Sequence, residues 1–178
     1  MDAADQARPP EWEEVARQIN ECRYLFVDHI QELEELTLEL TVTEARVQDR
    51  ILVPRDASGV AQLVAGGSPI ERDSSCRSFR LIFDRNQMVS YTVLNESYGK
   101  YPMDPERFTG KLFRVFSQSH LLDFTKSTTY ASDEYPGVLQ HYQVACLNHV
   151  VDVICTGPPK MVVVENGSGN SSLPAIVH

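Results

Sequence analysis

The sequence predicts one α+β domain, in which an N-terminal helix packs on a mainly antiparallel β-sheet and one short helix is inserted near residue 120. Apolar residues recur every three to four positions near the N-terminus and again near residue 120, whereas elsewhere they alternate or form short branched runs. At 178 residues, with 42% hydrophobic and 23% charged content, the chain can build one full core. We expect a single domain over residues 1–165 and a flexible Gly/Ser/Asn-rich tail over 166–178.

The first helix is expected over about residues 10–27. Pro9 and Pro10 suit a first helical turn, and three glutamates follow them at the positive end of the helix dipole. Apolar residues then form a stripe at spacings of three and four: Trp12, Val15, Ala16, Ile19, Cys22 and Phe26.

The centre of the chain is strand-like. Alternation of apolar and polar residues from Leu36 to Val42 predicts a strand with one exposed face. Residues 77–83 and 88–94 both resemble strands, and the polar residues between them predict a hairpin. Residues 60–65 fit either a strand or a helix, and residues 111–116 predict a further strand.

The C-terminal third combines a helix with strands. A short helix is expected from Ser117 or Ser119 to about Lys126, because either serine can cap its N-terminus. The branched run over 139–156 is longer than an ordinary strand, so we expect a strand that is bent or bulged near Asn148 rather than a helix. Residues 161–164 predict a last strand that pairs back along a hairpin.

Charge and composition narrow the classes of function. The net charge of −9 disfavours nucleic acid as a partner and suits a basic protein, although solvation alone also explains it. We expect no membrane contact and a cytoplasmic location, because the chain shows neither a run of roughly 20 apolar residues nor a secretory signal at its start. The four scattered cysteines are expected to be buried, reduced thiols.

Motifs for common chemistry are missing from the sequence, which holds no nucleotide-binding, hydrolase or metalloprotease signature. Two His-x-x-Asp pairs occur, His120 with Asp123 and His149 with Asp152, but neither has further ligands at metal-binding spacing. No metal site and no cofactor is therefore predicted. His141 and His149 would share one face of a regular strand, whereas a bulge between them would separate them.

Four stretches of the sequence resemble a group of uncharacterised bacterial proteins: SPIERDSSCRSFRLIFD, VSYTVLNESY, KLFRVFSQSHLLDF and HYQVACLNHVVDVI. The resemblance covers about residues 68–159. It implies a bacterial origin and carries no fold or catalytic residue. Small acidic bacterial proteins of this kind also look like immunity proteins, which neutralise a cognate toxin, by analogy of size and charge.

Three hypotheses of function follow. The first is a non-enzymatic protein-binding module, in its specific form an immunity-type inhibitor of a basic toxin or other basic protein. Its expected contact surface is acidic: Glu32, Glu34, Glu35, Glu39, Asp133 and Glu134. The alternative is a small-ligand-binding protein or enzyme with a pocket lined by Tyr98, Arg114, His141 and His149. The third is a subunit that assembles through a sheet edge, and the oligomeric state stays open.

Overall fold

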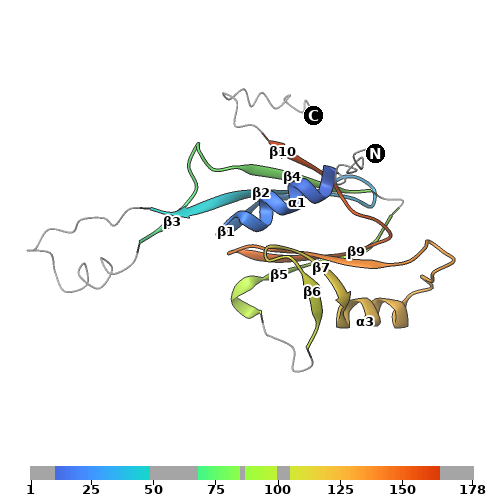
Figure 1. Ribbon diagram of the computed structural model, residues 1–178. Helices are drawn as coiled ribbons and strands as arrows, with labels where there is room; N and C mark the ends of the chain where they lie inside the picture. Colours follow the sequence, from blue (N-terminus) through green and yellow to red (C-terminus); the bar gives the residue numbers. More distant parts are fainter. Residues whose placement is uncertain (1–10, 49–67, 85–86, 100–104, 165–178) are drawn as a thin grey trace, which may run out of the picture.

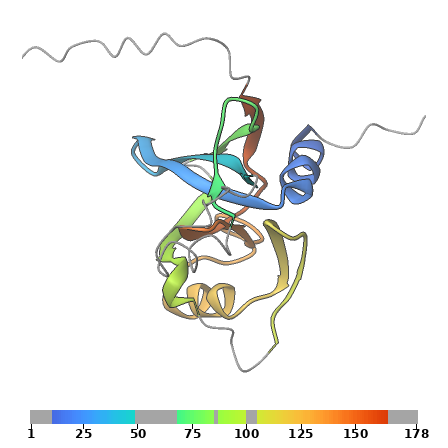
Figure 2. The same cartoon turned by 90° about the vertical axis from the view of Figure 1, so that its left-hand side faces the viewer.

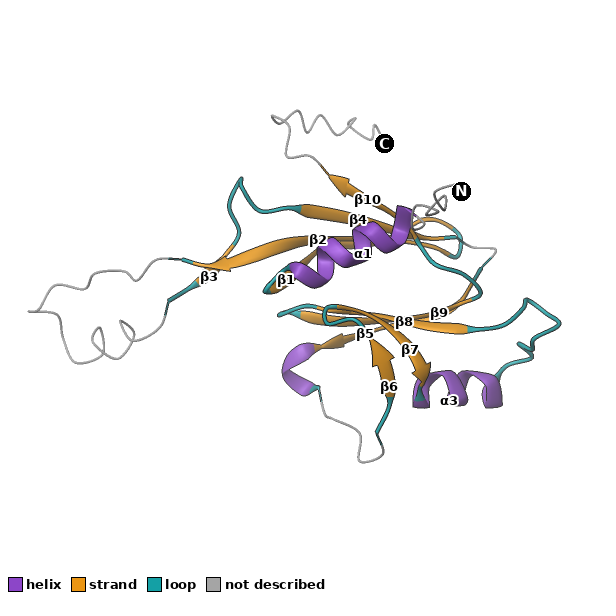
Figure 3. Cartoon of the chain, viewed as in Figure 1, coloured by secondary structure: helices purple, strands orange, loops and turns teal. Residues whose placement is uncertain are grey.

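Short alternating segments fold into two antiparallel β-sheets that stack on one hydrophobic core, with a helix along one side (Figure 1). The structure is a computed structural model, and it describes residues 11–48, 68–84, 87–99 and 105–164. Strands dominate these ranges (Figure 3). The α+β class, the N-terminal helix and the mainly antiparallel pairing expected from the sequence are confirmed.

The first sheet has the strand order β1–β2–β4–β10, and the short β3 pairs with the end of β2. Every pairing in it is antiparallel. Its strands are β1 (Tyr24–Glu34), β2 (Thr37–Val47), β3 (Ile70–Glu71), β4 (Ser78–Phe83) and β10 (Lys160–Val164).

The second sheet has the order β5–β9–β8–β7–β6 and is also antiparallel throughout. Its strands are β5 (Met88–Asn95), β6 (Arg107–Thr109), β7 (Phe113–Gln118), β8 (Gln140–Ala145) and β9 (His149–Cys155). A short 3-10 helix, η1 (Glu96–Tyr98), follows β5 directly.

The two α-helices cover different parts of this pair of sheets. Helix α1 (Glu11–Glu21) buries Val15, Ala16 and Ile19 and packs against β10 and β7, so it contacts both sheets from one side (Figure 2). Helix α3 (His120–Thr128) lies on the far side of the second sheet, where it packs against β8. Within the described ranges, no helix combines the length and the apolar character that crossing a bilayer requires.

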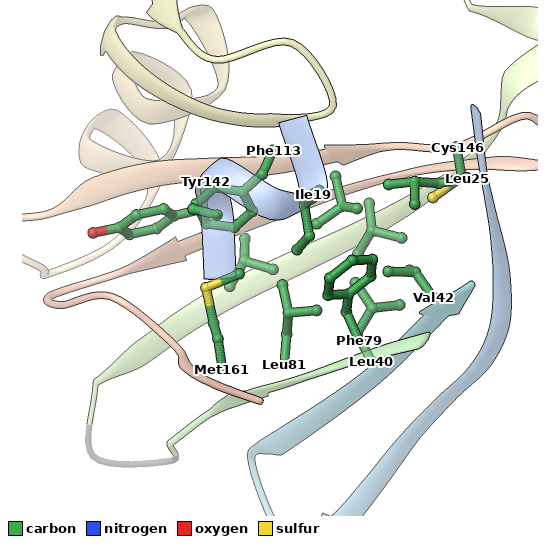
Figure 4. Close-up of a cluster of buried hydrophobic side chains, with 14 of the residues drawn as sticks. Ile19, Leu25, Leu40, Val42, Phe79, Leu81, Phe113, Tyr142, Cys146 and Met161 are labelled. Atoms are coloured by element: carbon green, nitrogen blue, oxygen red, sulfur yellow. The ribbon is translucent and has the colours of Figure 1, made fainter. Parts of the chain in front are cut away.

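The core fills the space between the sheets (Figure 4). Leu40, Phe79 and Leu81 of the first sheet face Phe113 and Tyr142 of the second sheet, whose ring centroids are 5.8 Å apart. Each such buried side chain contributes roughly 1.5–3 kcal/mol of transfer free energy. All four cysteines are buried free thiols, as the sequence predicts.

Several predicted elements are confirmed within a few residues. The strand expected from Leu36 is β2, those expected at 77–83, 88–94 and 111–116 are β4, β5 and β7, and the last strand is β10. Helix α3 begins after Ser119, whose hydroxyl accepts a hydrogen bond from the Leu122 backbone N–H at 3.1 Å. The alternating or branched character of these segments is a local signal that survives folding.

The first helix is shorter than predicted, because it ends at Glu21 and the chain enters β1 at Tyr24. The apolar residues that predict the helix, spaced three and four apart, extend into Tyr24–Val27, where apolar residues also recur at every second position. Leu25 and Val27 are buried in the core, as the second pattern requires. Pairing of Tyr24 to Phe26 with β2 decides between the two patterns, since it satisfies the backbone and buries Leu25. Strand β1 was missing from the prediction.

The predicted hairpin between residues 77–83 and 88–94 is wrong. Strand β4 pairs with β2 and β10 in the first sheet, whereas β5 pairs with β9 in the second. The connection between them therefore crosses from one sheet to the other.

The single strand expected over 139–156 is also wrong, because β8 and β9 form a hairpin that turns at Cys146–Asn148. Strand β10 then pairs with β4 rather than folding back on β9. Residues 60–65 and the tail 166–178 lie outside the described residues.

Candidate ligand-binding site

One face of the second sheet packs on the core, and the opposite, outer face carries polar side chains. Alternation along β8 sends Tyr142 and Val144 into the core, so His141, Gln143 and Ala145 point outward. Figure 2 shows that this sheet is curved, with β5 and β6 on opposite sides and α3 across the outer face. The outer face is therefore partly enclosed.

Three polar side chains lie in register across this outer face. Arg114 of β7 is paired with Gln143 of β8, which is paired with Asp152 of β9. Arg114 Nη1 donates to Gln143 Oε1 at 2.8 Å, and Gln143 Nε2 donates to Asp152 Oδ1 at 2.7 Å. We call Arg114, Gln143 and Asp152 the polar row.

Apolar side chains flank the polar row on both sides. Towards α3 lie Phe108 and Phe116, with ring centroids 5.1 Å apart. On the other side, Leu94 and Val150 are paired across β5 and β9, and Ala145 follows in the same register on β8. The polar row thus crosses an otherwise apolar stretch of the outer face, which forms the floor of a cavity.

A cavity of about 570 Å³ lies over this floor. Its floor comes from β7, β8 and β9, and its walls come from the start of β1, the end of β5 with η1, and the segment that enters β6. The lining residues are Arg23, Tyr24, Leu25, Leu94, Glu96, Gly99, Pro105, Glu106, Phe108, Leu112, Arg114, Phe116, Gln143, Ala145, Cys146, Leu147, Val150 and Asp152.

The wall beside Arg114 is held by a polar side chain of α1. Asn20 Oδ1 accepts hydrogen bonds from the backbone N–H groups of Lys111, Leu112 and Phe113 at 2.8, 2.8 and 3.0 Å. The turn also needs a glycine, because Gly110 has φ +89° and an added Cβ would lie 2.0 Å from the Phe113 carbonyl oxygen. Helix α1 therefore fixes the approach to β7.

Contacts within the chain hold Arg114 in place. Its Nε donates to the Lys111 carbonyl oxygen at 3.0 Å, and its guanidinium carbon lies 4.7 Å from the centroid of the Phe108 ring. These contacts and the bond to Gln143 leave Nη2 without a hydrogen-bond partner in the described part of the chain. The same holds for Oδ2 of Asp152 among the described residues.

A hydrogen-bonded chain behind the floor orients Asp152. Ser119 Oγ lies 2.6 Å from His141 Nδ1, and His141 Nε2 lies 2.9 Å from Asp152 Oδ1. The Phe116 ring stacks on the imidazole with 4.1 Å between centroids. Ser119 and His141 are 1% and 2% exposed, so this serine is closed to a substrate and serves as a cap and a support.

The cavity also contains a thiol, that of Cys146. Burial raises its pKa from the ordinary 9.0 to about 12, so the sulfur is protonated at neutral pH. A protonated buried thiol is a poor nucleophile. Cys146 therefore contributes apolar surface to the cavity.

Of the four pocket residues expected from the sequence, the structure brings two together. Arg114 lines the cavity, and His141 lies directly behind its floor. Tyr98 is 80% exposed in η1 and His149 opens β9, and neither is among the lining residues.

Gln143 and Asp152 were missed as site residues. The sequence pairs Asp152 with His149, three residues away, whereas the structure pairs it with His141 across the β8–β9 hairpin. Placing the turn at Cys146–Asn148 would have brought His141, Gln143 and Asp152 onto one face. Among the described residues, no group of three or more His, Cys, Asp or Glu side chains could hold a metal ion.

The acidic residues expected to contact a partner fall in separate places. Glu32, Glu34 and Glu35 are exposed at the tip of the β1–β2 hairpin, and Glu32 accepts a hydrogen bond from the Tyr91 hydroxyl at 3.0 Å. Glu39 is buried on β2 and lies 3.6 Å from Arg80 Nε. Asp133 and Glu134 are exposed in the connection between α3 and β8.

Comparison with known proteins adds no family to this description. No protein-family model, curated protein or solved structure matches the chain. What can be inferred about function therefore comes from the geometry of the site.

Proposed function

We propose that this protein binds a small organic molecule in the cavity on the outer face of its second sheet. The observation that carries this proposal is a cavity of about 570 Å³ whose apolar floor is crossed by the polar row. Small-molecule sites have volumes of roughly 300–1,000 Å³, largely apolar linings and a few convergent polar groups.

Preorganisation supports the same proposal. The guanidinium of Arg114 is held by Lys111, Gln143 and Phe108, and the carboxylate of Asp152 is held by His141 and Gln143. Side chains that are already ordered lose little rotamer entropy on binding, so more of the contact energy remains as affinity. Binding, rather than covalent chemistry, fits a site whose serine is buried and whose thiol is protonated.

A ligand screen by amide NMR tests the proposal. Fragments that bind are expected to shift the resonances of Leu94, Gln143 and Val150 in the wild-type protein. Ala145→Leu should reduce fragment affinity at least about tenfold, because the larger side chain occupies the floor between the apolar residues. Ala131→Leu, the same change in the α3–β8 connection outside the cavity lining, is the control. Shifts confined to other regions, or equal binding by both variants, would refute the proposal.

A second candidate function is protein binding through the tip of the β1–β2 hairpin, and we infer it from two exposed leucines. Leu33 and Leu36 are 53% and 55% exposed and lie among the acidic Glu32, Glu34 and Glu35. Leu36 also has φ +62°, a conformation that costs a branched side chain free energy. An apolar centre with a charged rim is typical of a protein contact. An immunity-type inhibitor of a basic toxin is the specific form of this proposal.

The doubly substituted variant Leu33→Ser/Leu36→Gly tests the second candidate without harming the fold. Glycine relieves the positive φ, so the variant should unfold at the same temperature as the wild type or higher. Co-purification with the products of neighbouring genes at low ionic strength is the measurement. The proposal expects the wild type to capture a basic protein that the variant does not; equal capture, or none by either, counts against it.

A further inference from the structure

The cavity separates positive from negative charge along the direction that crosses the strands. Arg114 lies on β7. Arg23 lies on the same side, because Lys111, just before β7, donates from Nζ to the carbonyl oxygen of the preceding residue, Cys22, at 2.8 Å. Asp152 lies on β9, and Glu96 lies on the same side at the end of β5, which pairs with β9.

One carboxylate departs from this pattern. Glu106 precedes β6, on the side of the arginines, and its Oε1 accepts a hydrogen bond from the His120 backbone N–H at 2.8 Å. That contact directs it towards the start of α3. The charged side chains of the floor itself are Arg114 and Asp152, whereas Arg23 and Glu96 lie in the walls.

These two charges are placed for one ligand to reach both. Arg114 and Asp152 occupy the same register on strands separated only by β8. Their backbones are therefore two strand spacings, about 10 Å, apart. Both side chains reach inward to the amide of Gln143, and each keeps one open atom, Nη2 and Oδ2.

A ligand of a single charge fits this floor poorly. A carboxylate bound at Arg114 alone covers Asp152 while Oδ2 of that carboxylate has no partner, and an amine bound at Asp152 alone does the same to Nη2 of Arg114. Covering a charged group without a partner costs free energy, and a neutral ligand covers two of them. A molecule with both charges satisfies the guanidinium and the carboxylate together.

We propose that the ligand is a zwitterion of the amino-acid type with an apolar side group, its carboxylate at Arg114 and its ammonium at Asp152. Its apolar group lies beside the polar row, on Ala145 and Val150. This inference rests on the proposed small-ligand function and adds the class of ligand.

Four probes that share the phenylalanine side chain separate the contributions of the two charges. L-phenylalanine carries both charges, N-acetyl-L-phenylalanine only the negative one, L-phenylalanine amide only the positive one, and N-acetyl-L-phenylalanine amide neither. The dissociation constants are measured by titration calorimetry or by amide NMR at low salt. L-phenylalanine should bind at least about tenfold more tightly than either singly charged probe, and the neutral probe should be weakest.

Two variants that each remove one charge assign the charges of the ligand to their partners. Arg114→Gln should weaken L-phenylalanine and N-acetyl-L-phenylalanine at least about fivefold and leave L-phenylalanine amide unchanged or tighter. Asp152→Asn should show the reverse. Each variant thereby carries its own control, because retained binding of one probe shows that the cavity is intact.

The results of these experiments separate the zwitterionic ligand from the small-ligand function on which it rests. If the fragment screen finds ligands at Gln143 and Val150 but singly charged probes bind as well as L-phenylalanine, the zwitterion is refuted and the small-ligand function stands. The same holds if none of the four probes binds. If neither fragments nor probes perturb the cavity, both are refuted.

Discussion

Single asparagines connect parts of the chain that are distant in sequence. Asn20 offers one oxygen to three backbone N–H groups of the turn before β7. Asn148 uses both ends of its amide, since Oδ1 accepts from the Val27 N–H and Nδ2 donates to the Val27 carbonyl, each at 2.9 Å. The first contact needs only an acceptor, whereas the second needs an acceptor and a donor. Substitution by aspartate should therefore be tolerated at position 20 and destabilising at position 148.

Asn20 is expected to tolerate aspartate but not leucine. Asn20→Asp keeps the acceptor and adds charge facing three donors, so the free energy of unfolding should stay within about 1 kcal/mol of the wild type. Asn20→Leu leaves the three N–H groups without their acceptor and should cost at least about 2 kcal/mol. Urea denaturation at neutral pH measures both values. Equal stability of the leucine and aspartate variants would show that Asn20 does not hold the turn.

Asn148→Asp is expected to destabilise where Asn20→Asp does not. The carboxylate loses the donor to Val27 and faces that carbonyl oxygen at hydrogen-bond distance, so we expect a loss of about 1–3 kcal/mol at pH 7. Lowering the pH below about 4 protonates the carboxyl, restores a donor and should recover part of the loss relative to the wild type. A variant as stable as the wild type at pH 7 contradicts the two-ended contact.

At the scale of elements, α3 supports the floor of the cavity through its N-cap. Ser119 Oγ lies 2.6 Å from His141 Nδ1 and also accepts from the Leu122 N–H, so one hydroxyl joins the start of α3 to β8. His141 in turn holds Asp152. The helix thus reaches the polar row through one buried serine and one buried imidazole.

Ser119→Ala is expected to lower the free energy of unfolding by about 2–3 kcal/mol. Loss of the cap costs about 1 kcal/mol, and the buried imidazole nitrogen that loses its partner adds about 1–2 kcal/mol. Ser127→Ala, at an exposed serine of the same helix that bonds the Phe124 carbonyl, is the matched control and should change stability by less than about 0.5 kcal/mol. Equal effects of the two changes would remove the support that we assign to Ser119.

Helices and strands were predictable from the sequence where a local pattern of residues identifies them, but the pairing of the strands was not. The alternation of Leu36–Val42 and the serine cap before His120 each identify an element by themselves. The pairing of β4 with β2 and β10 depends on residues far apart in the chain, which no local pattern encodes. The candidate site was predicted incompletely for the same reason. Arg114 and His141 were predicted from the sequence, but Asp152 comes next to His141 only because the chain turns between β8 and β9.

For the whole molecule, two sheets around one core bury several ionisable side chains. Burial raises the pKa of the Cys146 and Cys155 thiols from 9.0 to about 12, and that of the Tyr142 hydroxyl from 10.0 to about 12. Between the ordinary and the raised pKa, the unfolded chain has released protons that the folded chain still holds. The folded state therefore becomes less stable as the pH rises through this window.

Alkaline pH is expected to destabilise the protein steeply above pH 9. Each buried thiol lowers the free energy of unfolding by up to about 1.4 kcal/mol per pH unit between pH 9 and 12, and Tyr142 adds to the slope above pH 10. Urea denaturation at pH 7, 8, 9, 10 and 10.5 gives the slope. Cys146→Ala should reduce it, whereas Tyr130→Phe, at a fully exposed tyrosine, should not. A flat profile to pH 10.5 would contradict burial of the thiols.

Intermolecular nuclear Overhauser effects from a bound ligand, either L-phenylalanine or a ligand from the fragment screen, test most directly whether a small molecule binds on the outer face of the second sheet. We expect contacts from the ligand's apolar group to the methyl groups of Ala145, Val150 and Leu94, which line the cavity. We expect none to Leu81, which lies in the core between the sheets. Contacts to Leu33 and Leu36 at the hairpin tip, or saturable binding without any contact to Ala145, would contradict binding on this face.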